Sequence, residues 1–231
     1  MSHFAPQARA TVADVIRSRH SIRRFLPTPV SRKIVSELLE LAARAPSGGN
    51  VQPWRAHVLA GEARAAFSAA ILSEYEQGRQ DKRDFDFYPD KWREPWLSRR
   101  RKMGLGLYGL LHIDKGDKER MRAQSGRNYL FFDAPVGMIL TLDEALGRGM
   151  FLDCGVFIGN LLIAARAYGL DTCVQDSFAD YPATIRRHLK LGENERVVTG
   201  VALGYADPNA PENQLVTERE PVERFAEFYG F

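Results

Sequence analysis

Residues 45–54 read APSGGNVQPW, and this stretch separates two elements of different kinds. Before it, Ser31 precedes apolar residues at helical spacing, which predicts a helix that Pro46 ends. After it, RAHVLAG at 55–61 predicts a short strand. One interpretation of the stretch is a helix end and a turn with an aromatic anchor. The other is a loop whose exposed N–H groups and amide side chains bind a flat, polar ligand.

The remaining pattern mixes helices and strands without strict βαβ alternation, which predicts a single α+β domain over residues 1–231. Within it, the aromatic and charged residues after position 78 indicate an excursion from the core at about 78–130. A C-terminal arm is expected at about 207–231, and its aromatic end could dock on a partner subunit. Helices are predicted at 62–77, 93–112, 117–130, 150–168 and 181–191, and further strands at 136–142, 172–176 and 196–206.

Composition narrows the class of protein. The chain has 231 residues, 45% hydrophobic content and a net charge of +3, a balance without the clustered basic excess of a nucleic-acid binder. Its two cysteines, Cys154 and Cys173, show no metal or disulfide spacing, so reduced thiols and no metal site are expected. The N-terminus lacks an apolar signal region, and the apolar segment at 155–165 is too short to span a bilayer. We therefore expect a cytoplasmic protein that binds neither membrane nor nucleic acid.

The segment RHSIR at 19–23 is a candidate phosphate site. In extended backbone, alternate side chains share a face, so Arg19, Ser21 and Arg23 would point the same way. Two guanidinium groups beside a hydroxyl can bind phosphate oxygens in bidentate fashion. The alternative is a solvated basic turn between two helices.

The two stretches together suggest a flavin with a phosphate tail. Gly48 and Gly49 offer unobstructed amides, while Asn50 and Gln52 each present a donor and an acceptor. With YGLDTCVQDSF, GVALGYADP and TEREPVERF following in order, the chain resembles the nitroreductase family of FMN-dependent oxidoreductases from about residue 12 to 225.

This resemblance implies a three-layer α+β fold, with a mainly antiparallel central sheet surrounded by helices, in a domain-swapped homodimer. It implies FMN as cofactor and NADPH or NADH as electron donor. Three groups of residues are implied to bind FMN. The phosphate and ribityl group is Arg19, His20, Ser21, Arg23 and the late Arg219; the loop from the other subunit is Pro46, Ser47, Gly48, Asn50 and Gln52; the pair beside flavin N5 is Asp176 and Ser177.

The activity implied is ping-pong hydride transfer through flavin N5 to a small aromatic acceptor, nitroaromatic or quinone-type, with no catalytic side chain. Two positions depart from many relatives: Thr217 replaces a lysine, and Asp176-Ser177 replaces Glu-Gly. Three alternatives stay open. They are a reductive dehalogenase or flavin-fragmenting enzyme of the same fold, a flavin-binding protein without turnover, and a nucleic-acid binder that uses Arg99 to Lys102.

Several other features have two interpretations. GLGLYG at 104–109 fits a dinucleotide-binding pattern but lacks a preceding buried strand. The basic run 99–102 is either a solvated helix face or a site for the extra phosphate of NADPH. Trp92 and Trp96, at helical spacing, belong to a lid or to a core stripe. Gly155 and Gly159 would let another helix approach, which the resemblance places at a dimer interface.

Overall fold

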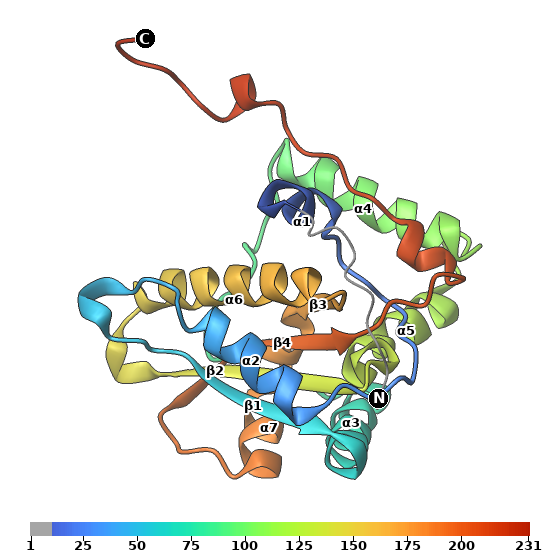
Figure 1. Ribbon diagram of the computed structural model, residues 1–231. Coiled ribbons are helices and arrows are strands. Elements are labelled where there is room, and N and C mark those ends of the chain that lie inside the picture. The colour runs from blue at the N-terminus through green and yellow to red at the C-terminus, as the bar shows by residue number, and fades with distance from the viewer. Residues whose placement is uncertain (1–10) are drawn as a thin grey trace, which may run out of the picture.

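The computed structural model describes residues 11–231. The expectation that the N-terminus lacks a signal segment falls largely on residues 1–10 and lies outside the described residues. A four-stranded antiparallel sheet in the order β1-β2-β4-β3 lies at the centre, with helices on both faces (Figure 1). The strands are β1 (Arg55–Ala60), β2 (Val136–Asp143), β3 (Asp171–Gln175) and β4 (Glu195–Gly204). The helices are α1 (Val12–Ser18), α2 (Arg32–Ala42), α3 (Gly61–Glu76), α4 (Trp96–Leu110), α5 (Lys118–Gly126), α6 (Met150–Ala167) and α7 (Pro182–Leu189).

Two apolar clusters make the layers. On one face of the sheet, α2 and α6 pack Leu38 and Leu161 against Met138 of β2. On the other face, Phe67 of α3 and Ile185 of α7 pack with two 3-10 turns, η2 (Arg127–Asp133) and η4 (Asp176–Asp180). The predicted α+β fold, with helices on both faces of an antiparallel sheet, is therefore confirmed.

A bulge in the central strand pair sets which side chains face each layer. The pairing of β2 with β4 shifts after Leu140, so that Thr199 and Val197 take successive partners and Val198 is the extra residue. Because side chains alternate along a strand, the extra residue reverses the alternation of β4. Val198 and Val201 consequently face the same cluster although their spacing is odd.

Helix α6 agrees with the helix predicted at 150–168 and contains the apolar segment 155–165. Its 18 residues are long and apolar enough to cross a bilayer by length and composition alone. A core helix meets the same two criteria. Here Cys154, Phe157 and Leu161 are buried against α2 and the sheet, which makes α6 a core helix.

The helices of the excursion at about 78–130 differ in their bounds from those predicted. Helix α4 begins at Trp96, after Pro95, so Trp92 lies outside it and the two tryptophans do not share a helical stripe. Residues 104–109 lie inside α4, which removes the dinucleotide-binding interpretation of GLGLYG. Helix α5 ends at Gly126 rather than near 130, and the 3-10 turn η2 follows.

The C-terminal arm leaves the body of the protein after passing α4 (Figure 1). Its aromatic side chains are exposed in the single chain; they are Phe225, Phe228, Tyr229 and Phe231. Such a run of exposed rings is unusual for a chain end without a partner.

Candidate functional site

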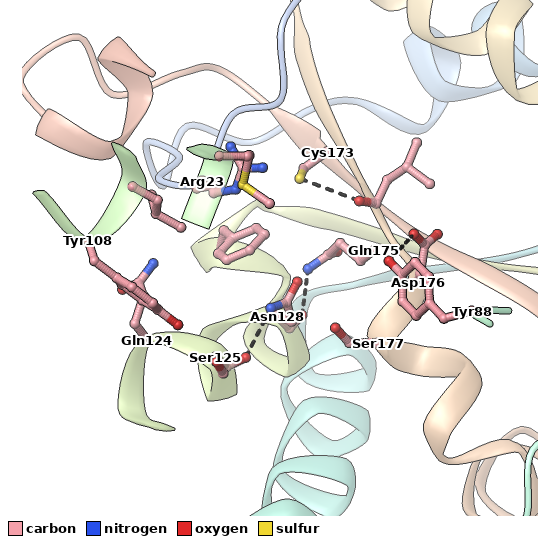
Figure 2. A pocket seen from close by; sticks show the side chains of 14 residues that line it. Arg23, Tyr88, Tyr108, Gln124, Ser125, Asn128, Cys173, Gln175, Asp176 and Ser177 are labelled. Carbon is pink, nitrogen blue, oxygen red and sulfur yellow. Dashed lines mark hydrogen bonds between the residues drawn. The ribbon is translucent and has the colours of Figure 1, made fainter. Parts of the chain in front are cut away.

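A cavity of about 260 Å³ lies where the segment after α1 meets β3, α4 and α5 (Figure 2). Arg23, Asp176 and Ser177 line it, so the structure brings together the predicted phosphate segment and the pair expected beside N5. Its other lining residues are Tyr88, Met103, Leu107, Tyr108, Gln124, Ser125, Asn128, Phe132, Cys173, Val174 and Gln175.

The basic segment and Cys173 occupy one side of this cavity. Burial raises the pKa of the Cys173 thiol to about 11, and the charges of Arg23 and Arg19 and the Ser21 hydroxyl act in the opposite direction. Both arginines and Ser21 therefore lie near one buried sulfur atom, as their alternation along the chain predicts. A thiol with so high a pKa is a poor nucleophile, which agrees with a packing role for Cys173.

Asn213 holds the basic segment in place from the far end of the chain. Its Oδ1 accepts hydrogen bonds from the backbone N–H groups of Arg23, at 2.7 Å, and Arg24, at 3.1 Å. Its Nδ2 donates to the Arg24 carbonyl at 2.7 Å. The His20 ring contacts the Asn213 carbonyl through Nε2 at 3.0 Å and the Ser18 carbonyl through Nδ1 at 3.1 Å. His20 thus ties the segment to the arm.

The Asp176 carboxylate forms another part of the cavity wall. Its Oδ2 accepts a hydrogen bond from the Tyr88 hydroxyl at 3.3 Å (Figure 2). Its Oδ1 accepts one from the Thr199 hydroxyl at 3.2 Å. Burial raises the pKa of Asp176, and these two hydrogen bonds oppose the shift only in part. The cavity therefore has a carboxylate that retains its proton to higher pH than a solvated aspartate.

Two buried amide atoms in the cavity wall lack a hydrogen-bond partner within residues 11–231. They are Oε1 of Gln175 and Nε2 of Gln124. Gln175 is 1% exposed, and its Nε2 donates to the Asn128 carbonyl at 2.6 Å, which fixes Oε1 as the free end. An unpaired buried polar group costs about 1–3 kcal/mol. A ligand that presents both donors and acceptors, as a flavin ring edge does, would satisfy both atoms.

The predicted loop at 46–52 lies elsewhere. Gly48 donates its backbone N–H to Asp153 Oδ2 at 3.2 Å, at the start of α6, and Gln52 donates its own to Ser47 Oγ at 3.0 Å. Asn50 and Gln52 adopt positive φ angles of 57° and 53° and are exposed. None of the predicted loop residues lines the cavity of their own chain.

Arg219 also stands apart from Arg23. It lines a second cavity between the arm and α4, and its guanidinium bonds the Thr217 carbonyl and hydroxyl at 3.0 and 2.8 Å. Met103 lines both cavities, so the two share a wall. The basic run is partly neutralised there, because Arg99 pairs with Glu220 at 2.9 Å and Lys102 with Glu218 at 2.7 Å.

The sequence did not point to Gln124, Gln175, Tyr88 or Asn213. Only Gln175 had a local signal, since it directly precedes Asp176 on a predicted strand. The others come from a separate helix, the aromatic excursion and the arm, and no spacing in the sequence relates them to the cavity.

Comparison with known proteins agrees with this architecture. A family model described as "Nitroreductase family" matches residues 16–205. The structure superposes on the crystal structure of the FMN and NADPH-dependent nitroreductase NfnB from Sphigopyxis sp. strain HMH with a TM-score of 0.93. The two sequences are 34% identical, and the match covers 96% of this chain and 100% of that one. The class is therefore that of the nitroreductase fold.

Two curated relatives cover nearly the same length. The chain is 42% identical to a 4-nitrobenzoate reductase from Pseudomonas putida, over 94% of this chain and 95% of the relative. It is 39% identical to a 4-nitrobenzoate reductase from Nocardioides sp. (strain LMS-CY), over 93% of this chain and 88% of the relative. The chain belongs to the nitroreductase family.

Proposed function

We propose that this chain is an FMN-dependent NAD(P)H oxidoreductase that reduces nitroaromatic or quinone-type acceptors. The observation that carries the proposal is the cavity in which Arg23, Asp176 and Ser177 meet beside the unpaired Gln175 Oε1. When bound there, FMN would supply the hydride and electron transfer between NADPH or NADH and the acceptor.

The residues of the chain would bind and orient this cofactor. Arg19 and Arg23 would neutralise its phosphate, because arginine matches phosphate oxygens in bidentate fashion, and the Ser21 hydroxyl would donate a hydrogen bond to it. A backbone N–H at Asp176 or Ser177 would face the ring, and the amides of Gln175 and Gln124 would satisfy its polar edge. The Asp176 carboxyl group, whose pKa burial raises, lies in the same wall. No protein nucleophile is required.

His20 and Arg219 have less direct roles in this proposal. Because both ring nitrogens of His20 contact carbonyl oxygens, His20 would position the basic segment against the arm rather than touch the phosphate. Arg219 is exposed in the neighbouring cavity, from which it would close over the phosphate end.

The second half of the site would come from another copy of the chain. Pro46, Ser47, Gly48, Asn50 and Gln52 lie outside the cavity of their own chain, and one chain offers a volume below the roughly 300–1,000 Å³ of usual ligand pockets. Two surfaces support a homodimer. A Cβ added at Gly155 or Gly159 of α6 would meet nothing within 4 Å, and the aromatic arm is uncovered.

We further propose that the acceptor is a small nitroaromatic compound and that the protein is cytoplasmic, a single domain without nucleic-acid or membrane partners. Two relatives named for 4-nitrobenzoate reduction support the substrate class. The excursion at about 78–130 and the arm at about 207–231 would be additions to this one domain.

The test combines cofactor content with turnover. The purified chain should carry flavin absorbance or bind added FMN, and should then oxidise NADPH or NADH when 4-nitrobenzoate is present, with loss of the nitro compound in proportion. Protein that neither binds FMN nor consumes nicotinamide contradicts the proposal. Flavin binding without turnover on any nitroarene or quinone would instead favour a carrier, and halide release from a halogenated arene would favour a dehalogenase.

A further inference from the structure

The segment between α3 and α4 is fastened to the body of the protein. Asp84 has a side chain only 6% exposed, and its Oδ2 accepts from Arg186 Nη1 at 2.7 Å and from the Val197 backbone N–H at 3.0 Å. Asp81 Oδ2 accepts from the Thr184 N–H at 2.8 Å. These contacts of Asp84 and Asp81 fix the start of the segment, and with it the position of Tyr88.

Tyr88 connects the cavity to an arginine on α4. Its hydroxyl donates to Asp176 inside the cavity, while its ring lies 5.5 Å from the ring of Trp92. The guanidinium carbon of Arg100 lies 5.2 Å from the Trp92 ring centroid and 5.9 Å from that of Tyr88. Stacking of this kind holds the guanidinium in place but leaves its N–H groups free to donate.

Arg100 differs from the basic residues around it. Arg99 and Lys102 are paired with Glu220 and Glu218 of the arm. No carboxylate within residues 11–231 lies within 4.0 Å of Arg100, although the residue is fixed by two rings and one of these rings lines the cavity. A cation that has no carboxylate partner among the described residues, and that stacks on a ring lining a ligand cavity, is a site for an anionic group of the ligand.

The charges of the cavity explain why such a group would need Arg100. When ionised, Asp176 repels an anionic acceptor, and it lies directly against the Tyr88 hydroxyl. Arg23 lines the same cavity but is assigned to the phosphate in the proposed function. Arg100 is therefore the cation left to attract an acid on the Tyr88 side.

We propose that Arg100 binds the carboxylate of an aromatic acid acceptor and thereby sets the preference for nitroarene carboxylates over neutral nitroarenes. This proposal rests on the proposed function, since it names the substrate class of the same site. The aryl ring would stack near Tyr88 and Trp92, and the guanidinium would donate to the carboxylate.

The experiment compares two acceptors of nearly the same shape, 4-nitrobenzoate and its methyl ester, with the FMN-loaded enzyme. We expect Arg100→Gln to lower the ratio of kcat/KM for the acid to kcat/KM for the ester by about 10- to 100-fold, mainly through KM, because one charge-assisted contact is lost. Arg100→Lys should restore part of the ratio. Arg101→Gln is the matched control, since it removes the same charge from an exposed neighbour that has no ring beneath it among the described residues.

General damage to the site lowers kcat/KM for both acceptors and cancels in the ratio. If kcat/KM falls for both acceptors and the ratio stays unchanged, the proposal is overturned. An equal fall in Arg101→Gln would also overturn it, because the effect would then be net charge alone. Calorimetric titration with benzoate and benzamide tests the same contact without turnover. If benzoate binds more weakly to Arg100→Gln and not to Arg101→Gln, the carboxylate site is supported. If the wild-type enzyme reduces neither acceptor, that result contradicts the proposed function and not the carboxylate site.

Discussion

Residues 19–23 and residues 46–52 are both expected to bind one cofactor, yet only the first segment reaches the cavity. Arg23 lines it and the charge of Arg19 acts on the pKa of Cys173 in its wall, whereas the loop residues Asn50 and Gln52 are exposed outside it. The way each segment is held also differs. Asn213 fixes the first from 190 residues away, while the loop is held by Ser47 within it and by Asp153 of α6.

This difference indicates how the site would be divided in the proposed dimer. A segment that binds ligand within its own chain is held by contacts that complete the cavity wall. A segment that serves a neighbouring chain must be exposed, with its shape fixed locally. The loop has these properties, since its backbone is set by a turn and by positive φ angles rather than by the cavity. The comparison therefore predicts different consequences for changes on the two sides.

The largest effect is expected from removing the phosphate charges. Arg19→Ala with Arg23→Ala should weaken FMN binding by about 3–6 kcal/mol, at about 1.5–3 kcal/mol for each charge-assisted contact. That is a loss of roughly 10²- to 10⁴-fold in affinity, measurable by titration of flavin fluorescence. The control is Arg17→Ala with Arg44→Ala, two exposed arginines outside the cavity. If the first variant purifies with full flavin content, the phosphate assignment is wrong.

Much of this arrangement was accessible from the sequence because local rules determine it. The helix after Ser31 forms as predicted, with the Ser31 side chain accepting from the Ile34 N–H. Thr11 and Asp14 form a capping box of the usual residue types, and Gly169 follows α6 with a positive φ angle. The buried strands followed from continuous apolar runs. The alternation in RHSIR depends only on extended backbone, and Arg19, Ser21 and Arg23 all act on the pKa of Cys173, while their role at a phosphate stays a prediction.

The missed parts depend on contacts between distant segments. The hydrogen bonds of Asn213 to the Arg23 segment join residues 190 positions apart, and the hydrogen bond of Tyr88 to Asp176 joins residues 88 positions apart. No spacing pattern in the sequence predicts contacts at such separations. The helix predicted from 93 was placed too early, although proline disfavours helical backbone in the residue before it, and α4 begins after Pro95. The helix predicted to 130 was placed too late, because the 3-10 turn η2 directly follows α5 at Gly126.

A second substitution tests whether the loop at 46–52 reaches the cavity of another chain through the proposed dimer interface. Gly159→Arg places a charged side chain on α6 where a single chain has open space within 4 Å. The fold of one chain should tolerate it, but a second copy packed on this face would not. We expect a monomer in light scattering and FMN affinity reduced at least about tenfold, or 1.4 kcal/mol, because the loop from the partner is lost.

The matched control is Ala69→Arg, an exposed position on α3 on the other face of the sheet. It should leave both the mass and the FMN affinity unchanged. A Gly159→Arg protein that remains a dimer with normal FMN affinity would show that α6 is not the interface, and would separate the loop from the site.

The cavity side should also respond to pH through Asp176. Burial raises its pKa above the ordinary 3.8, so the folded chain binds this proton more tightly than the unfolded chain does. Between the pKa of the unfolded chain and the higher pKa of the folded chain, the free energy of unfolding falls as pH rises, and it stays lower at higher pH. The Asp176→Asn variant has no carboxyl group at this position and does not lose this stability. Without FMN, the melting temperature of Asp176→Asn should therefore rise relative to that of the wild type between pH 4 and pH 7. The difference should be about 2–4 °C for each 1 kcal/mol of unfolding free energy that the wild type loses.

Asp90→Asn serves as the control for this measurement, because the Asp90 side chain is exposed. It should follow the wild-type pH profile. If Asp176→Asn follows that profile as well, then the carboxylate is better solvated than its position suggests, and the cavity wall does not hold a proton.

The smallest effect is expected on the loop side. Asp153→Ala removes the oxygen that accepts the Gly48 N–H at 3.2 Å, an exposed contact at the start of α6. We expect a loss of about 1 kcal/mol in FMN affinity, or roughly fivefold, because the loop would be less well ordered when it reaches the partner. Asp153→Asn keeps an acceptor and should lose less. Isothermal titration with FMN measures both, and an equal loss in the two variants would mean that the charge at the helix start matters rather than the hydrogen bond. An affinity that stays unchanged while the loop becomes more susceptible to protease would mean that residues 46–52 have no part in binding, and the cofactor would then belong to one chain.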